Sequence, residues 1–297
     1  MGEQAIVGPT SHFYVSQRLK MHYVDWGNEG KPLLVIVHGT LDHARSFDWV
    51  AKALRDDYHV VAPDLRGHGD SAWAIGGDYS MIGYVTDLAQ MLAQIGSFPA
   101  VLVGHSLGAG IVLQYAGAFP EHVAKVVAVE GLGPTPRRGE PAQRPTHERI
   151  QQWVKQQRDL ATRQPRRYKS LDEAVDRTRE QHKRLTLEQA KHVTAHGLSR
   201  NEDGTHSWKY DNYIRASRMA YPYHEDDTSG VWSHITAPTL LVNGELSFAV
   251  RGEDERVKAF PNARSVTIPN ASHWVHHDQL EVFINVLREF LGAQERS

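Results

Sequence analysis

The 297-residue sequence predicts an α/β fold, in which strands and helices alternate along the chain. Two observations support this fold class. Several short, β-branched apolar runs lack the alternation of half-exposed strands, which is typical of parallel strands covered on both faces. The segments between them repeat apolar residues at helical spacing. We therefore expect a mostly parallel sheet whose strands are joined by right-handed crossovers.

The predicted elements follow one another in a simple order. Alternating polar and apolar residues from Phe13 to Asp25 predict an opening antiparallel pair of strands. The runs that predict buried parallel strands are residues 33–37, 58–62, 100–103, 126–129, 239–242 and 265–268. Helical periods cover residues 81–95, 111–116 and 280–290.

The alternation stops between residues 134 and 230, where the pattern predicts an all-helical insertion. Capping residues open helices at Ser170, at Thr186 and at Asp211, and the first two helices are expected to run to Lys183 and Gly197. This segment holds 19 Lys+Arg and 14 Asp+Glu, against 14 and 21 in the rest of the chain. We expect solvated helix faces and a division into a first core part (1–133), a helical cap (134–232) and a second core part (233–297).

Composition excludes several classes of protein. The chain has no Cys, which removes disulfides, thiolate metal sites and a cysteine nucleophile. A net charge of −2 and a pI near 6.8 argue against nucleic-acid binding. No apolar run reaches the ~18 residues that span a bilayer, and the start Met1-Gly2-Glu3-Gln4 does not resemble a signal peptide. We expect a cytoplasmic protein with no membrane or nucleic-acid partner, and the sequence leaves open whether it is a monomer or a homodimer.

The sequence Gly104-His105-Ser106-Leu107-Gly108 lies between a predicted strand and a predicted helix. A strand that turns at once into a helix forces its middle residue into strained backbone angles, so the positions two before and two after it must be small. The Ser106 hydroxyl would then stand at the carboxyl edge of the sheet, at a helix N-terminus that favours negative charge. We predict that Ser106 is a nucleophile.

A serine nucleophile needs a base, and His273 is the candidate among 18 histidines. His273 follows the last predicted strand and precedes the last helix, which places it at the same sheet edge as Ser106. His276 and His277 come next, but no carboxylate cluster at ligand spacing accompanies them, so no metal site is expected. Most of the remaining histidines are expected at the surface.

A carboxylate must orient the histidine, and two candidates remain open. Glu130 directly follows the strand at 126–129, at the edge where it could reach His273. Glu245 follows the strand at 239–242 and is the alternative. We favour Glu130.

The turn after the first parallel strand, His38-Gly39-Thr40, is the candidate for half of an oxyanion hole. Gly39 would let the chain fold back close to the nucleophile. The expected donors are the backbone N–H groups of Thr40 and Leu107.

These motifs, with Asp64-Leu65-Arg66-Gly67-His68-Gly69-Asp70-Ser71, resemble the α/β-hydrolase superfamily over residues 20–291. The resemblance implies an eight-stranded, mostly parallel sheet with a helical cap inserted after strand 6, as in epoxide hydrolases and haloalkane dehalogenases. Those two groups carry Asp as nucleophile, so Ser106 implies ester chemistry instead. Many members have an Asp where this chain has Ser247, whereas some place the acid after strand 6, where Glu130 stands.

The implied cap would cover Ser106 and supply substrate contacts. Aromatic candidates are Trp153, Trp208, Tyr210, Tyr213, Phe248 and Trp274, and Asp42 and His43 follow the oxyanion turn. Of these we single out Asp42, Trp208, Phe248 and Trp274 as substrate-binding candidates.

The sequence thus predicts a cofactor-independent serine hydrolase that cleaves a small carboxylic ester or lactone through an acyl-enzyme. One alternative is hydrolysis of a carbon–carbon bond in a vinylogous diketone by a similar Ser-His-acid site. Another is a ligand receptor that retains the hydrolase site and signals by cap closure.

Overall fold

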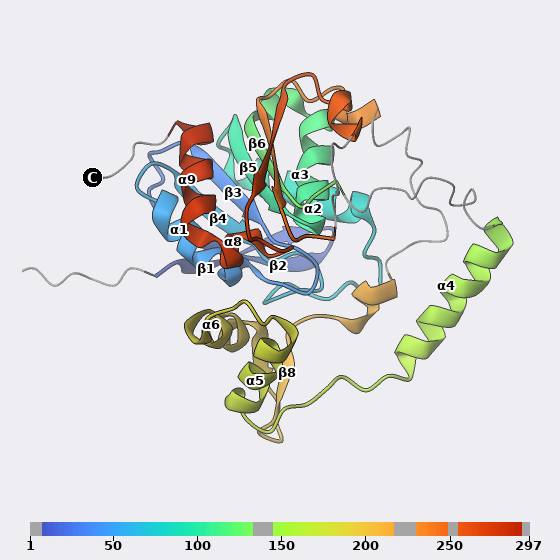
Figure 1. Cartoon of the computed structure of the whole chain (residues 1–297). Coiled ribbons are helices and arrows are strands. Elements are labelled where there is room, and N and C mark those ends of the chain that lie inside the picture. The colour runs from blue at the N-terminus through green and yellow to red at the C-terminus, as the bar shows by residue number, and fades with distance from the viewer. Residues whose placement is uncertain (1–7, 133–144, 217–229, 249–254, 293–297) are drawn as a thin grey trace, which may run out of the picture.

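A computed structural model of the chain describes residues 8–132, 145–216, 230–248 and 255–292, and its centre is an eight-stranded sheet (Figure 1). In spatial order the strands are β1 (Thr10–Ser16), β2 (Leu19–Asp25), β4 (His59–Pro63), β3 (Leu33–Val37), β5 (Ala100–His105), β6 (Val123–Val129), β9 (Thr239–Gly244) and β10 (Ala263–Ile268). Strand β2 runs antiparallel to its neighbours β1 and β4, and all other pairs are parallel. The predicted α/β-hydrolase fold is confirmed.

Helices cover both faces of the sheet. The helices α1 (Asp48–Leu54) and α9 (Leu280–Leu291) lie on one face, and α2 (Met81–Ile95) and α3 (Leu107–Ala118) lie on the other (Figure 1). Shorter helical elements are η1 (Ala44–Phe47), η2 (Pro120–His122), η4 (Glu255–Ala259) and α8 (Val275–Asp278).

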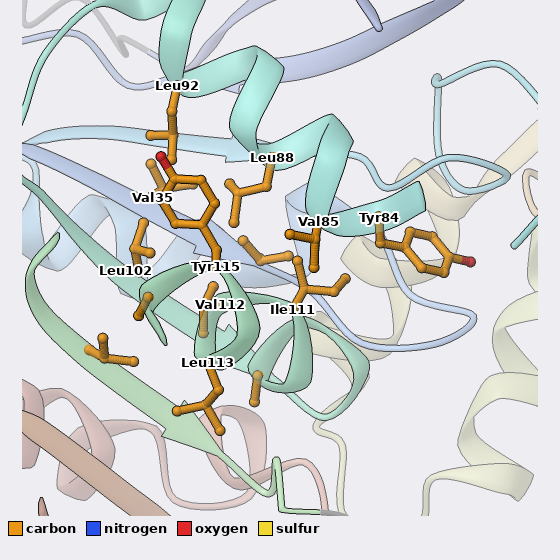
Figure 2. Packing of buried hydrophobic residues seen from close by; sticks show 14 of the residues in the cluster. Val35, Tyr84, Val85, Leu88, Leu92, Leu102, Ile111, Val112, Leu113 and Tyr115 are labelled. Atoms are coloured by element: carbon orange, nitrogen blue, oxygen red, sulfur yellow. The ribbon is translucent and has the colours of Figure 1, made fainter. Parts of the chain in front are cut away.

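The apolar run of β3 shows why such a strand lacks alternation. Leu33, Val35 and Val37 pack toward α2 and α3, and Leu34 and Ile36 pack toward α1 and α9. All five are fully buried because both faces of the strand are covered. Figure 2 shows the first of these layers, in which Val35 and Leu102 of the sheet meet Leu88 and Val85 of α2 and Ile111 of α3.

The cap between β6 and β9 is more varied than an all-helical insertion. Its elements are α4 (Thr146–Ala161), α5 (Leu171–Gln181), α6 (Leu187–Gly197), a hairpin of β7 (Leu198–Arg200) and β8 (His206–Trp208), and η3 (Asn212–Ala216). The prediction of an all-helical insertion was therefore wrong. It missed the hairpin because each strand has three residues, too few to show a pattern.

The predicted caps are present at the cap helices. Ser170 accepts a hydrogen bond from Glu173 N at the start of α5, and Thr186 and Gln189 form a capping box at α6. Helix α5 ends at Gln181, two residues before Lys183. Asp211 precedes a single 3-10 turn rather than a helix. The predicted core–cap boundary at 133–134 lies outside the described residues.

The described part of the cap is held to the core by α6 and by Asp211. In α6, the His192 ring lies 2.9 Å from Asp48 Oδ2, and the carbonyl of Val193 lies 2.9 Å from His43 Nε2. Asp211 N donates to Gly67 O at 2.8 Å. In Figure 1, α5, α6 and β8 accordingly lie next to the core, whereas α4 projects from it. None of the helices in the described ranges has the length and apolar character needed to cross a membrane.

Candidate active site

Ser106 occupies a strained turn between β5 and α3. Its backbone angles are φ 52° and ψ −113°, and its N–H donates to Val129 O of the neighbouring strand at 2.8 Å. A Cβ added at Gly104 would lie 2.4 Å from Gly108 O, and one added at Gly108 would lie 2.2 Å from Val37 O. Both glycines are thus required by close backbone packing, for the steric reason that the sequence motif indicates. The strain is of the kind found at nucleophiles held above a sheet edge.

His273 lies between β10 and α8, and it contacts Glu130. His273 Nδ1 is 3.3 Å from Glu130 Oε2, and the Glu130 side chain is completely buried. Across the described residues, Ser106 Oγ makes no hydrogen bond to the His273 ring. Such bonds commonly form only when a substrate is bound.

The Glu130 carboxylate is fixed by donors from β9 and the turn after it. Gly244 N donates to Oε1 at 2.6 Å, and the Ser247 hydroxyl donates to Oε2. Glu130 itself has a positive φ of 56°, and its N–H donates to Val242 O at 2.9 Å. Ser247, the residue found where many α/β-hydrolases carry Asp, therefore supports the carboxylate that projects from the neighbouring strand.

The alternative acid, Glu245, is directed elsewhere. Its side chain is exposed, and its Oε2 accepts a hydrogen bond from Asn270 N at 2.9 Å. Of the two candidates, the structure brings Glu130 to His273.

The predicted oxyanion turn packs against Ser106. A Cβ added at Gly39 would lie 2.9 Å from His105 Nδ1 and 3.2 Å from Ser106 Cβ, so only a glycine permits this approach. Thr40 follows directly and is exposed. Leu107 is the first residue of α3, where backbone N–H groups have no acceptor within the helix. Leu107 therefore follows Ser106 in sequence, and Thr40 follows the glycine that packs against Ser106.

Many histidines of the described ranges are buried, contrary to the expectation that most would be at the surface, and several of them lie near this edge. Within the part of the chain that the structure describes, eight are buried: His22, His38, His43, His59, His68, His105, His276 and His277. Burial lowers the pKa of His105 and of His277 to about 3, with neighbouring histidines adding to the effect. Burial also holds the pKa of His276 well below its usual value. The imidazoles of His105, His276 and His277 are therefore neutral at physiological pH.

One carboxylate that is distant in sequence, Asp42, approaches His276 in the structure. Donor atoms of Asp42, His105 and His276 lie within 4.8 Å of one another, although these residues are far apart in sequence. Both Asp42 oxygens already accept hydrogen bonds, from His43 N at 2.9 Å and from Ser46 Oγ at 2.8 Å. We therefore interpret this group as part of the buried polar layer that supports the oxyanion turn.

The predicted substrate-binding residues line two cavities between core and cap. A cavity of about 330 Å³ is lined by Thr40, Asp42, Trp208 and Trp274 among others. A second, of about 440 Å³, is lined by Phe248, His273 and Trp274. Trp274 therefore contributes to both.

Phe248 and Trp274, which lie near His273, each contact the ring of a histidine. Phe248 is 70% exposed, and its ring centroid lies 4.9 Å from that of His273. Trp274 stacks on His182 of the cap, with ring centroids 4.0 Å apart. Sequence reasoning did not select His182 or Arg215 as lining residues. No local motif marks these two residues, because they reach the cavity only when the cap folds.

Comparison with known proteins identifies the family. A family model described as alpha/beta hydrolase fold matches residues 32–280. The mouse sn-1-specific diacylglycerol lipase ABHD11 is 29% identical over 284 residues, which cover 90% of this chain and 83% of that protein. Human epoxide hydrolase 4 is 33% identical over 40% of this chain, but this match covers 34% of its own length.

Among solved structures, the thioesterase domain from the curacin biosynthetic pathway has a TM-score of 0.83 at 22% identity, over 96% of this chain and 100% of that one. This likeness concerns the fold. The matched model spans most of the chain, and a lipase among the relatives supports hydrolysis of ester bonds. The chain belongs to the α/β-hydrolase family.

Proposed function

We propose that this protein is a serine hydrolase that cleaves a small carboxylic ester or lactone through an acyl-enzyme intermediate. Ser106 attacks the carbonyl carbon while His273 accepts the hydroxyl proton. His273 then gives that proton to the leaving oxygen, and the alcohol departs. A water molecule, deprotonated by the same histidine, cleaves the acyl-enzyme and regenerates Ser106.

Glu130 has an electrostatic role in this scheme. Its buried carboxylate, 3.3 Å from His273 Nδ1, favours the tautomer that leaves Nε2 free to accept a proton, and it stabilises the imidazolium that forms. The N–H groups of Thr40 and Leu107 stabilise the negative charge that develops on the carbonyl oxygen. Ser106, His273 and the two N–H groups act directly on the ester, and Glu130 acts through His273. The scheme needs no cofactor.

The single observation that carries the proposal is the Glu130–His273 contact at the edge where Ser106 turns. The carboxylate is oriented by Gly244 N and by the Ser247 hydroxyl, so its position is set before substrate binds. The diacylglycerol lipase among the relatives, an ester hydrolase by name, adds support for the reaction type.

The proposal is tested with p-nitrophenyl acetate and butyrate and with a fluorophosphonate label. We expect Ser106→Ala to lower kcat/KM by at least about 10⁴-fold and to abolish labelling, because the nucleophile is lost. The matched control is Ser199→Ala, which changes an exposed serine of β7 and should leave both readouts unchanged. Labelling or turnover that survives in folded Ser106→Ala protein would overturn the proposal.

A further inference from the structure

Two adjoining cavities connect the oxyanion turn to the interior of the cap. The cavity of about 330 Å³ begins at Thr40. A further cavity of about 200 Å³ lies within the cap. The two share the lining residues Gln181, Trp208, Tyr210 and Arg215, so they meet at these side chains. A molecule whose carbonyl lies beside Thr40 can therefore extend toward Arg215.

The cavity of about 200 Å³ is the inner cavity, and the cavity that begins at Thr40 is the outer cavity. The inner cavity is lined by four arginines from three separate parts of the cap. Arg163 and Arg166 follow α4, Arg177 belongs to α5 and Arg215 belongs to η3. No Asp or Glu is present among the described residues that line it. Arginine stays charged at all relevant pH values, so four positive charges converge on one small space.

These charges are left largely without internal partners. Arg177 Nη1 binds Glu180 at 2.8 Å, but the Glu180 side chain is 66% exposed. Within the described ranges, Arg163, Arg166 and Arg215 form no ion pair. Asp42, which lines the outer cavity, accepts hydrogen bonds from His43 N and Ser46 Oγ and forms no ion pair with these arginines.

Two of the guanidinium groups lie over aromatic rings. Arg215 lies over the Tyr210 ring at 5.8 Å, and Arg166 lies over the Tyr168 ring at 5.3 Å. A guanidinium that lies over an aromatic ring can still donate its N–H groups to a planar anion. The arrangement suits a carboxylate or phosphate oxygen, which each arginine can bind through charge-assisted hydrogen bonds.

We propose that the substrate of this site carries an anionic group, a carboxylate or a phosphate, which binds Arg215 and its neighbouring arginines while the ester carbonyl lies at Ser106. This rests on the proposed function and narrows its substrate class from small esters to small anionic esters. The basic character of the cap, with 19 Lys+Arg against 14 Asp+Glu in residues 134–230, then has a function in recognition.

The kinetic test compares mono-p-nitrophenyl adipate with its methyl ester, which has the same chain but no charge. We expect the wild-type kcat/KM to favour the anion by about 10- to 100-fold, since hydrogen bonds to charged groups contribute ~1.5–3 kcal/mol. Arg215→Gln should collapse this ratio toward one, mainly through KM, and added NaCl should weaken the preference in the wild type.

The matched control is Arg167→Gln. Arg167 lies in the same segment as Arg166, but it pairs with Asp203 and does not line the inner cavity, so the ratio should persist. A wild-type ratio of one or below, or an equal loss on both substrates in Arg215→Gln, would overturn the inference.

A binding measurement separates this inference from the proposed function. Adipate and inorganic phosphate are titrated calorimetrically into the wild type, Arg215→Gln and Arg167→Gln. Binding that weakens at least tenfold in Arg215→Gln, but not in Arg167→Gln, supports the anion site even if neither ester is hydrolysed, and the stronger ligand identifies the preferred group. Absence of binding by either anion to the wild type, together with an ester ratio of one, contradicts it.

Discussion

The core half and the cap half of the site are built in opposite ways. In the core, Glu130 is completely buried and has defined donors for both oxygens. Ser106 is fixed by the close packing of Gly104 and Gly108. In the cap, the arginines are partly or fully exposed, and those at 163, 166 and 215 are held by no ion pair within the described residues.

Under the proposed function, this difference separates the groups that carry out the reaction from those that recognise the substrate. A group that moves protons must stay within a fraction of an ångström of its position, which requires buried hydrogen bonds and tight packing. A group that attracts a charged substrate can act from a flexible side chain, because Coulomb attraction falls slowly with distance. Substitutions in the core half should therefore cost orders of magnitude in rate, and those in the cap should change substrate preference.

Among variants that keep Ser106, the largest effect should come from the acid of the core half. We expect Glu130→Gln to lower kcat/KM by about 10³- to 10⁴-fold, because a neutral amide neither stabilises the imidazolium nor selects the required histidine tautomer. The loss should appear on charged and neutral esters alike. Steady-state kinetics on both substrates, with melting temperature as a check of folding, measure it.

Glu245→Gln is the matched control for this prediction. It changes the same residue type after the adjacent strand, at an exposed position that contacts Asn270 N. Activity should stay within about threefold of the wild type. If Glu245→Gln were the crippled variant and Glu130→Gln were active, the assignment of the acid would be reversed.

The next largest effect is a loss of folding stability at acidic pH, caused by buried histidines of the core. Burial lowers the pKa of His38, His105 and His277 to about 3, against 6.5 in an unfolded chain. Below pH 6.5 the unfolded chain therefore binds protons that the folded chain excludes. Each histidine contributes stability that is fully present above pH 6.5 and is lost as the pH falls toward 3, by about 2 kcal/mol at pH 5.

Urea unfolding at pH 7.5 and pH 5 measures this loss. His277→Gln should reduce the difference between the two pH values by about 2 kcal/mol, whatever its effect at pH 7.5. The exposed His12→Gln is the control and should leave the difference unchanged. Equal unfolding free energies of the wild type at both pH values would contradict the idea that His38, His105 and His277 stay neutral in the folded protein.

The smallest effect isolates the strain at the nucleophile. Ser106→Gly and Ser106→Ala both remove the hydroxyl, but only glycine relaxes at φ 52° and ψ −113°. We expect Ser106→Gly to unfold with a free energy about 1 kcal/mol higher than Ser106→Ala, since strained backbone angles cost ~1–3 kcal/mol. A chemical denaturation curve of each variant gives the value. An equal or lower stability of the glycine variant would show that the turn stores no strain.

The sheet could be predicted from sequence because its signals are local. The run at residues 33–37 is β3 itself, since full burial on both faces leaves an uninterrupted apolar segment. The turn at Ser106 could also be predicted from local sequence, because its steric requirement is met by glycines two residues before and after it. The β7–β8 hairpin could not, because three-residue strands with exposed polar residues carry no periodic signal.

What the sequence left open depends on contacts between distant segments. Glu130 and Glu245 both follow parallel strands, and local sequence does not tell which side chain turns inward. That depends on the donors Gly244 N and Ser247 Oγ, which reach Glu130 from another strand. Asp42 and His276, and likewise Arg163 and Arg215, become neighbours only through folding.

The pairing of β6 with β9 has a consequence for how such a protein can diversify. These strands are adjacent in the sheet, with Val126 opposite Thr239 and Val129 opposite Val242, and the whole cap is inserted between them. The insertion leaves and rejoins the sheet at strands about 4.8 Å apart, so its length and sequence place no demand on strand order. If the proposed function holds, exchange of this one segment should change the substrate range while the catalytic residues of the core stay in place.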